Sequence, residues 1–461
     1  MKKKGLFIAC FLWVAVAIVF AAPKKVTLDE LNAGGWKTYR GQSVRITTPL
    51  MVCATMFDSL ILSDERLFVP EERAVGLADG DSTEYRRLAE YNCLHRIKLE
   101  CKYPYHLSLG SRVKNLTARV MGERHLQTGA QPRFAQYRPN KQVPKRSKDD
   151  LVICAANVQN YFVHVGGYAT KRNTPGQHAL QCYKVASALV HIDADLYTLC
   201  ELEQGDSAPA ELVAKMNELY NKKHCNHLSP YTFVVTDTCD RDTISCGFIY
   251  KSARVQPRGD LHLAYRNHND IHAHRFLIQQ FIDNRTGERF YVSLNHPRSK
   301  RGNAAEANAK RVAELDTVFA AFERLHLNPD SLILFLGDYN AYAQEQSTQK
   351  IVRAGYQDMN AALDSAGYSY SYKGECGFLD RCYASPSMAE HIVSLRPLHW
   401  NTDYYYSAAY YSKYNYKNRS IPKDAPKDIR SVMTKAAKRN LLFRYSDHDP
   451  LLITVTFPSH Q

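Results

Sequence analysis

The stretch SLILFLGDYN, residues 331–340, places an apolar run of strand length directly before Gly337, Asp338 and Asn340. Similar apolar runs recur at 151–157 (LVICAAN), 195–201 (DLYTLCE), 290–296 (FYVSLNH) and 451–457 (LLITVTF). Helical patterns lie between them, as in 305–325, where apolar residues recur at every third or fourth position. This alternation predicts a layered α/β domain with large buried sheets over residues 151–461.

Polar side chains gather at the ends of these apolar runs: Asn157, Glu201, Asn295, His296, Asp338, Asn340, Asp447 and His448. Sites assemble at strand ends because the sheet is rigid while the loops carry the side chains. Residues i and i+2 of an extended segment point the same way, so Asp338 and Asn340 are expected to face one site. One such residue is usually a turn former. Five strand ends with Asn, Asp, Glu or His instead predict a common polar site.

The first part of the chain has a different sequence pattern, with shorter apolar segments. Short β-like segments at 43–53, 58–69, 94–102 and 111–122 are separated by Gly, Asp and Pro, which predicts a small all-β domain over residues 23–125. Residues 126–150 are rich in Gly, Pro and charges without an apolar period, as is typical of a linker. Two domains suit a chain of 461 residues, because single cores stop growing at about 250–300 residues.

Residues 1–22 have a Lys triplet, a short apolar stretch and small residues at the end, as a secretory signal peptide does. An uncleaved anchor is the alternative. We expect a secreted or periplasmic protein with no stable membrane insertion after cleavage, because no second apolar stretch of this kind follows. Eleven cysteines remain beyond Cys10, so at least one is unpaired within the chain. Close spacing makes three pairs candidates for disulfides: Cys93 with Cys101, Cys225 with Cys239, and Cys376 with Cys382.

The formal net charge of +14 suits a polyanionic partner, because Lys and Arg that contact phosphates release counterions. Solubility alone is the alternative explanation. Residues 399–440 interleave many tyrosines with Lys and Arg. Such a segment can stack bases and neutralise phosphates, or it can simply pack on its own tyrosines.

Six motifs occur in order along the chain: Asn157, Cys200-Glu201, Asn295-His296, Gly337-Asp338-Tyr339-Asn340, Gly377-Phe378-Leu379-Asp380 and Ser446-Asp447-His448-Asp449-Pro450. In this order the sequence resembles the endonuclease/exonuclease/phosphatase superfamily over residues 150–458. That superfamily includes pancreatic-type deoxyribonuclease. Segments such as NHPRSK (295–300) and GDYNAYAQE (337–345) are most similar to the bacterial extracellular nucleases. Those proteins often carry an OB-like β domain ahead of the catalytic one, and residues 40–130 are loosely similar to it.

The resemblance implies a four-layer αββα sandwich with the site at one edge. Glu201 would bind a divalent metal, with Asn157 and Asp447 beside it. Asp338 and Asn340 would orient the nucleophile and the phosphate. His296 would contact the phosphate and act as the general acid. His448 would be the base that activates water, and Asp380 would fix the tautomer of that base. Arg275 and Asn295 would contact the substrate.

The chemistry of these residue types agrees with this assignment. Phosphodiester hydrolysis needs charge neutralisation, an aligned water and a protonated leaving group. Carboxylate and amide oxygens suit Mg²⁺, with Mn²⁺ or Ca²⁺ as alternatives. A His paired with a carboxylate can shuttle protons near neutral pH. We therefore expect a secreted metal-dependent endonuclease that cleaves DNA, with RNA as a further candidate substrate.

Two other functions stay open. One is a sphingomyelinase- or inositol-phosphate-type phosphatase on the same fold, and the other is an inactive extracellular DNA-binding protein. Two departures from the family pattern also bear on the site. Cys200 stands where the family usually has Gln, and the segment after Trp400 is enlarged and basic. Cut-site preference, metal number, disulfide connectivity, the role of the first domain and oligomeric state are not readable from the sequence.

Overall fold

The computed structural model describes residues 22–56, 58–103, 107–164, 175–225, 227–236, 244–264, 275–404 and 442–458. The predicted signal segment lies outside them apart from Ala22. Most of the tyrosine-rich basic segment, residues 405–440, also lies outside them. Within the described ranges, no helix is long and apolar enough to span a membrane.

Two six-stranded sheets form the second domain within the described residues. The first sheet has the order β12 (Tyr231–Phe233), β13 (Ile244–Lys251), β11 (Leu196–Glu203), β10 (Leu151–Tyr161), β23 (Leu451–Val455) and β22 (Ile392–Pro397). The second has the order β14 (Val255–Leu263), β15 (Phe276–Asp283), β16 (Arg289–Asn295), β17 (Ile333–Asp338), β21 (Asp380–Ala384) and β18 (Gln357–Asp358). The apolar runs of the sequence therefore become central strands.

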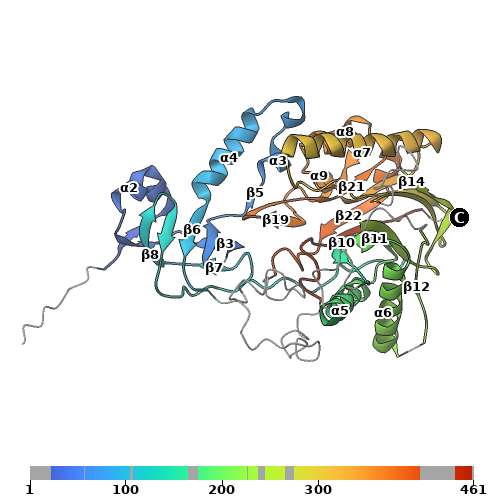
Figure 1. Cartoon of the computed structure of the whole chain (residues 1–461), viewed down its shortest axis with the longest axis horizontal. Helices are drawn as coiled ribbons and strands as arrows, with labels where there is room; N and C mark the ends of the chain where they lie inside the picture. The colour runs from blue at the N-terminus through green and yellow to red at the C-terminus, as the bar shows by residue number, and fades with distance from the viewer. Residues whose placement is uncertain are drawn as a thin grey trace, which may run out of the picture.

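The two sheets pack face to face, and helices cover their outer faces (Figure 1). Ile153 and Ala155 of β10 join Leu334 and Leu336 of β17 in the core between the sheets. The alternate residues of β10 pack instead under α5 (Pro175–Ile192) and α6 (Ser207–His224). Similarly, α7 (Ala304–Arg324) and α8 (Gln346–Arg353) cover the second sheet. The predicted four-layer αββα sandwich is confirmed.

The first domain is an eight-stranded sheet among the residues that the structure describes, with the order β1-β2-β8-β9-β6-β4-β3-β7. Its strands are β1 (Lys24–Val26), β2 (Ser43–Ile46), β3 (Leu50–Thr55), β4 (Ser59–Ser63), β6 (Ile97–Glu100), β7 (Arg112–Val113), β8 (Leu116–Gly122) and β9 (His125–Gln127). The domain is not purely β, because α4 (Thr83–His95) lies between β5 (Leu67–Phe68) and β6. Polar residues that favour helices fill this segment, and the expectation of an all-β domain overlooked it.

The segment expected to be a linker runs along the second domain. Residues 128–150 form no helix or named strand in the described chain. Trp400 Nε1 donates to the carbonyl of Asn140 at 2.8 Å, and Arg146 forms an ion pair with Asp195 at 3.2 Å. Four of the candidate disulfide cysteines, Cys93, Cys101, Cys376 and Cys382, are free thiols. Cys225 is also free, and Cys239 lies outside the described residues.

The second sheet should depend strongly on Phe335, which is fully buried in β17 and packs against Phe322 and Tyr356. Phe335→Ala is expected to lower the free energy of unfolding by about 3–5 kcal/mol, because it leaves a cavity that the helices cannot fill. Chemical denaturation measures this. Leu363→Ala is the control, since Leu363 is 42% exposed, and it should change stability by less than about 0.5 kcal/mol. Equal losses for the two variants would contradict this packing.

Candidate active site

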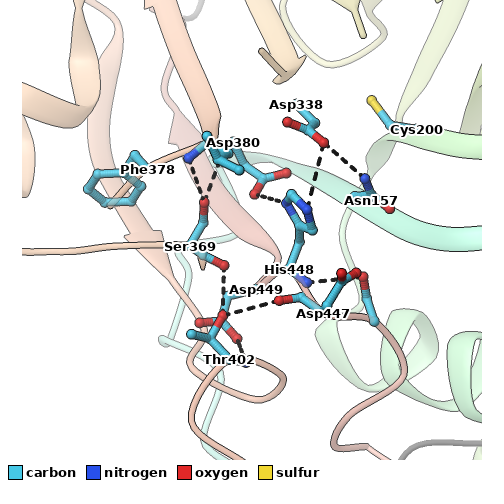
Figure 2. Close-up of polar contacts among 12 residues, drawn as sticks. Asn157, Cys200, Asp338, Ser369, Phe378, Asp380, Thr402, Asp447, His448 and Asp449 are labelled. Carbon is cyan, nitrogen blue, oxygen red and sulfur yellow. Dashed lines mark hydrogen bonds and ion pairs between the residues drawn. The ribbon is translucent and has the colours of Figure 1, made fainter. Parts of the chain in front are cut away.

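Strand ends from both sheets meet at one edge of the sandwich, as predicted from the sequence pattern. Asn157 and Glu201 come from β10 and β11 of the first sheet, and Asp338 and Asp380 come from β17 and β21 of the second. His448 lies just before β23 (Figure 2). The site therefore joins the two sheets.

Asp338 lies at the centre of this cluster. Its Oδ2 accepts a hydrogen bond from Asn157 Nδ2 at 3.0 Å and lies 3.7 Å from His448 Nε2, as Figure 2 shows. The same oxygen lies 3.7 Å from His296 Nε2. Its Oδ1 accepts from the backbone N–H of Asn340 at 2.9 Å. One carboxylate thus contacts or faces residues from three segments besides its own.

Glycine is required directly before this carboxylate. Gly337 has φ +135°, and a Cβ built there would lie 2.1 Å from the carbonyl oxygen of Asn295. Any side chain would push β17 away from β16 and move Asp338 with it. The Gly-Asp pair of the sequence motif therefore has a steric origin as well as a chemical one.

Burial raises the pKa of Asp338 to about 7, and the negative charges of Asp380 and Glu201 contribute to that rise. The positive charge of His448 and the Asn340 N–H oppose it. Asp338 is only 1% exposed, so water does little to stabilise its charge. The site thus holds a carboxylate that gains from a nearby cation.

Glu201 reaches the site through a bulge in β11. The register between β11 and β13 shifts between Cys200 and Leu202, and Glu201 has φ 67°, a left-handed conformation rare outside glycine. Its carboxylate accepts hydrogen bonds from Asn157 Nδ2 at 3.0 Å and from the backbone N–H of Asn160 at 2.8 Å. Burial raises the pKa of Glu201, and the charge of Asp447 adds to the rise.

These residues fit a divalent cation. Ligand atoms of Glu201, His296 and Asp338 all lie within 4.8 Å of one another. Two of the three are carboxylates whose pKa is raised, so a bound cation would relieve the cost of their burial. An oxygen-rich set with Asp447 nearby suits Mg²⁺, Mn²⁺ or Ca²⁺.

Asn157, predicted to lie beside the metal, connects two of the candidate ligands. Its Nδ2 donates to both Glu201 and Asp338, and its Oδ1 accepts from the backbone N–H of Gln159 at 2.8 Å. Two carboxylates on one side and an N–H on the other fix the orientation of this amide. Asn157 therefore holds the two carboxylates together, and its predicted place beside the metal stays a prediction.

His448 and Asp380 form a buried pair. His448 Nδ1 lies 2.8 Å from Asp380 Oδ2 (Figure 2). His448 is 6% exposed and Asp380 is 1% exposed. Burial lowers the pKa of His448, but the charges of Asp380 and Asp338 outweigh it and hold that pKa well above its usual value. The carboxylate of Asp380 fixes the ring so that Nε2 faces Asp338.

The other predicted residues divide between the site and the core. His296 is 4% exposed and faces Asp338, and its backbone N–H donates to the carbonyl of Arg275 at 2.9 Å. Asn340 lies beside Asp338, with Nδ2 donating to the carbonyl of Pro297 at 3.1 Å. Arg275 is partly buried, and a DNA contact by its side chain stays a prediction.

Asn295 does not reach the substrate side, which corrects its predicted role. It is fully buried, and Nδ2 donates to the carbonyl of Ser293 at 2.8 Å and to the hydroxyl of Tyr339 at 3.1 Å. Successive residues of an extended strand point to opposite faces, so the segment that turns His296 into the site turns Asn295 away. Cys200 likewise points into the core between the sheets, where its Sγ lies 3.9 Å from that of Cys246.

Several supporting residues were missed by sequence reasoning. Ser369 Oγ accepts from the backbone N–H of Asp380 at 3.1 Å (Figure 2). The carbonyl of Ser369 accepts from the backbone N–H of Asp449 at 2.8 Å. Asp449 Oδ1 in turn accepts from the N–H of Thr402 at 2.9 Å. The ring of Tyr370 lies 4.7 Å from that of His448. The alternation of tyrosine and serine over residues 368–372 is the sequence signal that could have pointed to Ser369 and Tyr370. It does not indicate which residues these two contact.

The stability of the metal-free protein should fall as pH rises toward neutrality. The folded-state pKa of Asp338 is about 7 against an ordinary 3.8, so the folded chain binds this proton more tightly than the unfolded chain. That advantage is complete at low pH and is lost as pH rises through this window. Thermal melting in EDTA measures it, and Asp338→Asn should flatten the profile. The same slope in the variant and the wild type would contradict the assignment.

The comparisons with known proteins agree with this geometry. A model of the Endonuclease/Exonuclease/phosphatase family matches residues 177–456, which is more than half of the chain. No curated protein sequence matches the chain. The motif-based resemblance to the superfamily is confirmed, and closeness to the bacterial extracellular nucleases stays a prediction.

Similar solved structures include a mannosyl-6-phosphatase of Bacteroides thetaiotaomicron, with TM-score 0.43 and 16% identity over 67% of this chain and 100% of that one. A humanized D. rerio TDP2 with 14 mutations has TM-score 0.40 and 15% identity over 67% and 100%. A further family member from B. thetaiotaomicron has TM-score 0.42 and 15% identity over 70% and 100%. Because the family model matches more than half of its residues, this chain belongs to the Endonuclease/Exonuclease/phosphatase family, whose members hydrolyse phosphate esters.

Proposed function

We propose that this chain is a secreted, metal-dependent endonuclease that hydrolyses the phosphodiester bonds of DNA, with RNA as a further substrate. The observation that carries the proposal is the buried His448–Asp380 pair, whose Nε2 faces the carboxylate of Asp338 at 3.7 Å. A second histidine, His296, lies with its Nε2 at the same distance from the same oxygen of Asp338. Two histidines around one acidic cluster suit a reaction that needs both a base and an acid.

The residues have complementary tasks in this reaction. His448 Nε2 takes the proton of the attacking water, while Asp380 holds Nδ1–H and so selects the tautomer. His296 Nε2 donates a proton to the leaving oxygen. Asp338 lies 3.7 Å from both Nε2 atoms and keeps both rings directed at the phosphate. Asn340 is held beside it by its bond to the carbonyl of Pro297.

Glu201 and Asp338, with Asp447 beside Glu201, would hold the divalent cation. When bound, that cation supplies positive charge that offsets the negative charge of the phosphate. It would also withdraw carboxylate charge from His448, which lowers the pKa of that ring toward the range where a base works. Asn157 keeps the two carboxylates at hydrogen-bonding distance from one amide.

Three features support a nucleic-acid substrate. Exposed Arg298, Lys300 and Arg301 follow His296 closely in the chain, and the whole chain carries +14. The Tyr370 ring beside His448 offers an aromatic face near the reacting phosphate, on which a base can stack. The sequence pattern of residues 1–22 supports export.

A decayed, non-catalytic binding protein is not favoured. Side chains of Glu201, His296, Asp338, Asp380 and His448 all converge, and the strained backbone at Glu201 persists. Strain of this kind costs of order 1–3 kcal/mol per residue, and it is retained where function needs it.

A plasmid-nicking assay tests the proposal. The wild type is expected to nick DNA with Mg²⁺ and to lose this activity in EDTA. His448→Ala should reduce the rate by about 10²–10⁴-fold, because the proton acceptor is gone. Asp380→Asn should also slow the reaction. The amide NH2 of asparagine can donate to Nδ1 of His448 and so favour the tautomer that carries its proton on Nε2, which cannot accept the proton of water. Absence of cleavage by the wild type with Mg²⁺, Mn²⁺ and Ca²⁺ would refute the nuclease proposal.

Salt dependence tests the contact with phosphates. Replacing both Arg298 and Arg301 by Ala should weaken DNA binding. It should also make the slope of log binding constant against log salt concentration shallower by about one to two, because about one to two phosphate contacts are lost. Fluorescence anisotropy with labelled DNA across a salt series gives both values. Arg289, exposed at the far end of β16, offers a control substitution to Ala that should leave the slope unchanged. An unchanged slope in the double variant would place the DNA elsewhere.

A further inference from the structure

A short segment of the first domain is built into the second domain next to the site. Strand β5 (Leu67–Phe68) pairs in parallel with β20 (Glu375–Gly377), which also pairs with β19 (Tyr370–Tyr372). The backbone N–H of Val69 extends this pairing by donating to the carbonyl of Cys376 at 2.9 Å. Figure 1 shows β5 and β19 where the two domains meet. The three-stranded sheet is thus shared between the domains.

The helix that follows β5, α3 (Pro70–Arg73), carries Glu72 into this junction. The carboxylate of Glu72 accepts hydrogen bonds from Arg381 Nη1 at 3.2 Å and 3.3 Å, and from the backbone N–H of Phe378 at 3.3 Å. The Arg381 side chain is fully buried, and that of Glu72 is only 11% exposed. Arg381 also pairs with Asp358. A buried charge needs such partners, so removal of Glu72 leaves Arg381 partly uncompensated.

The residues that Glu72 holds surround Asp380 on both sides. Phe378 precedes Asp380 by two positions, and Arg381 follows it directly. Arg381 Nη1 also donates to the carbonyl of Phe378 at 3.1 Å, which closes the turn around Asp380. Ser369 holds the same turn from the other direction through the N–H of Asp380. Glu72 is therefore part of the frame that sets where the Asp380 carboxylate meets His448.

We propose that Glu72 of the first domain is a positioning residue for the His448–Asp380 pair, and that the first domain thereby completes the active site. The inference rests on the proposed function for its kinetic part. The first domain then acts on the rate of the chemical step through contacts with residues 378–381, whatever else it does for substrate binding. Misplacement of a reacting group by about 1 Å can cost about 10²-fold in rate, so loss of these contacts should be visible in kcat.

The chain offers a matched control for this role. Asp79 of the first domain also pairs with an arginine of the second domain, Arg353, at 2.6 Å. That pair is exposed and does not contact residues 378–381 in the described structure. Asp79→Asn thus removes a cross-domain carboxylate without touching the turn around Asp380. It should leave kcat and KM unchanged.

The kinetic test uses the full-length chain, with Glu72→Ala and Glu72→Gln in the wild-type and Asp380→Asn backgrounds. Glu72→Ala is expected to lower kcat on DNA by about 10- to 100-fold with little change in KM. Glu72→Gln should lose less of kcat, because its amide oxygen can still accept one of the hydrogen bonds that Glu72 accepts. In the Asp380→Asn background the same change should have a much smaller effect, because the positioned carboxylate is gone. Equal effects in both backgrounds, or a change in KM alone, would overturn the proposal.

A spectroscopic test does not depend on turnover. The Nδ1–H proton of His448 in its bond to Asp380 should give a downfield NMR signal, identified by its loss in His448→Ala. Glu72→Ala should broaden or shift this signal, while Asp79→Asn should not. If the wild type cleaves no phosphodiester, the proposed function fails while this result still decides the positioning role. If Glu72→Ala does not fold, Glu72→Gln carries both tests, and an unperturbed signal together with unchanged kcat would refute the proposal.

Discussion

The burial of several carboxylates around one histidine is the constraint on which the rest of this structure depends. Asp338, Asp380 and Glu201 converge where strand ends of the two sheets meet, and little water reaches the first two carboxylates. Burial raises the pKa of both Asp338 and Glu201. The chain offsets this cost with the Asn157 amide, backbone N–H groups and the His448 ring. The left-handed backbone of Glu201 and Asn340 adds strain. A fold tolerates such a cluster when a bound cation and an anionic substrate make use of it.

The sandwich makes this convergence precise. Asp338 and Asp380 occupy directly paired positions on β17 and β21, so their separation is fixed by the sheet ladder. Asn157 and Glu201 come from the other sheet, and the core between the sheets sets the distance between the two groups. His448 joins them from the segment just before β23. The first domain adds a third support, because β5 and Glu72 reach the turn that carries Asp380.

The sequence pattern was sufficient for the strands and for the residues at their ends. Buried strands such as β17 are apolar on both faces, so they are visible as continuous runs, and Asp338 and His448 follow from them. The direction of individual side chains was less predictable. Asn295 and His296 are adjacent, yet only the histidine faces the site, and the amide of Asn157 proved to be a donor. The contact of Glu72 with Arg381 spans 309 positions in the chain, and no local pattern encodes such a pairing.

Calorimetric titration of Mg²⁺ into the metal-free protein near pH 7, repeated in buffers of different ionisation enthalpy, tests the central claim most directly. If buried carboxylates with raised pKa values form the metal site, binding will release protons, because the cation displaces those held by the cluster. Glu201→Gln should then bind Mg²⁺ at least about tenfold more weakly. Binding without proton release, or with unchanged affinity in Glu201→Gln, would show that these carboxylates are not the metal site.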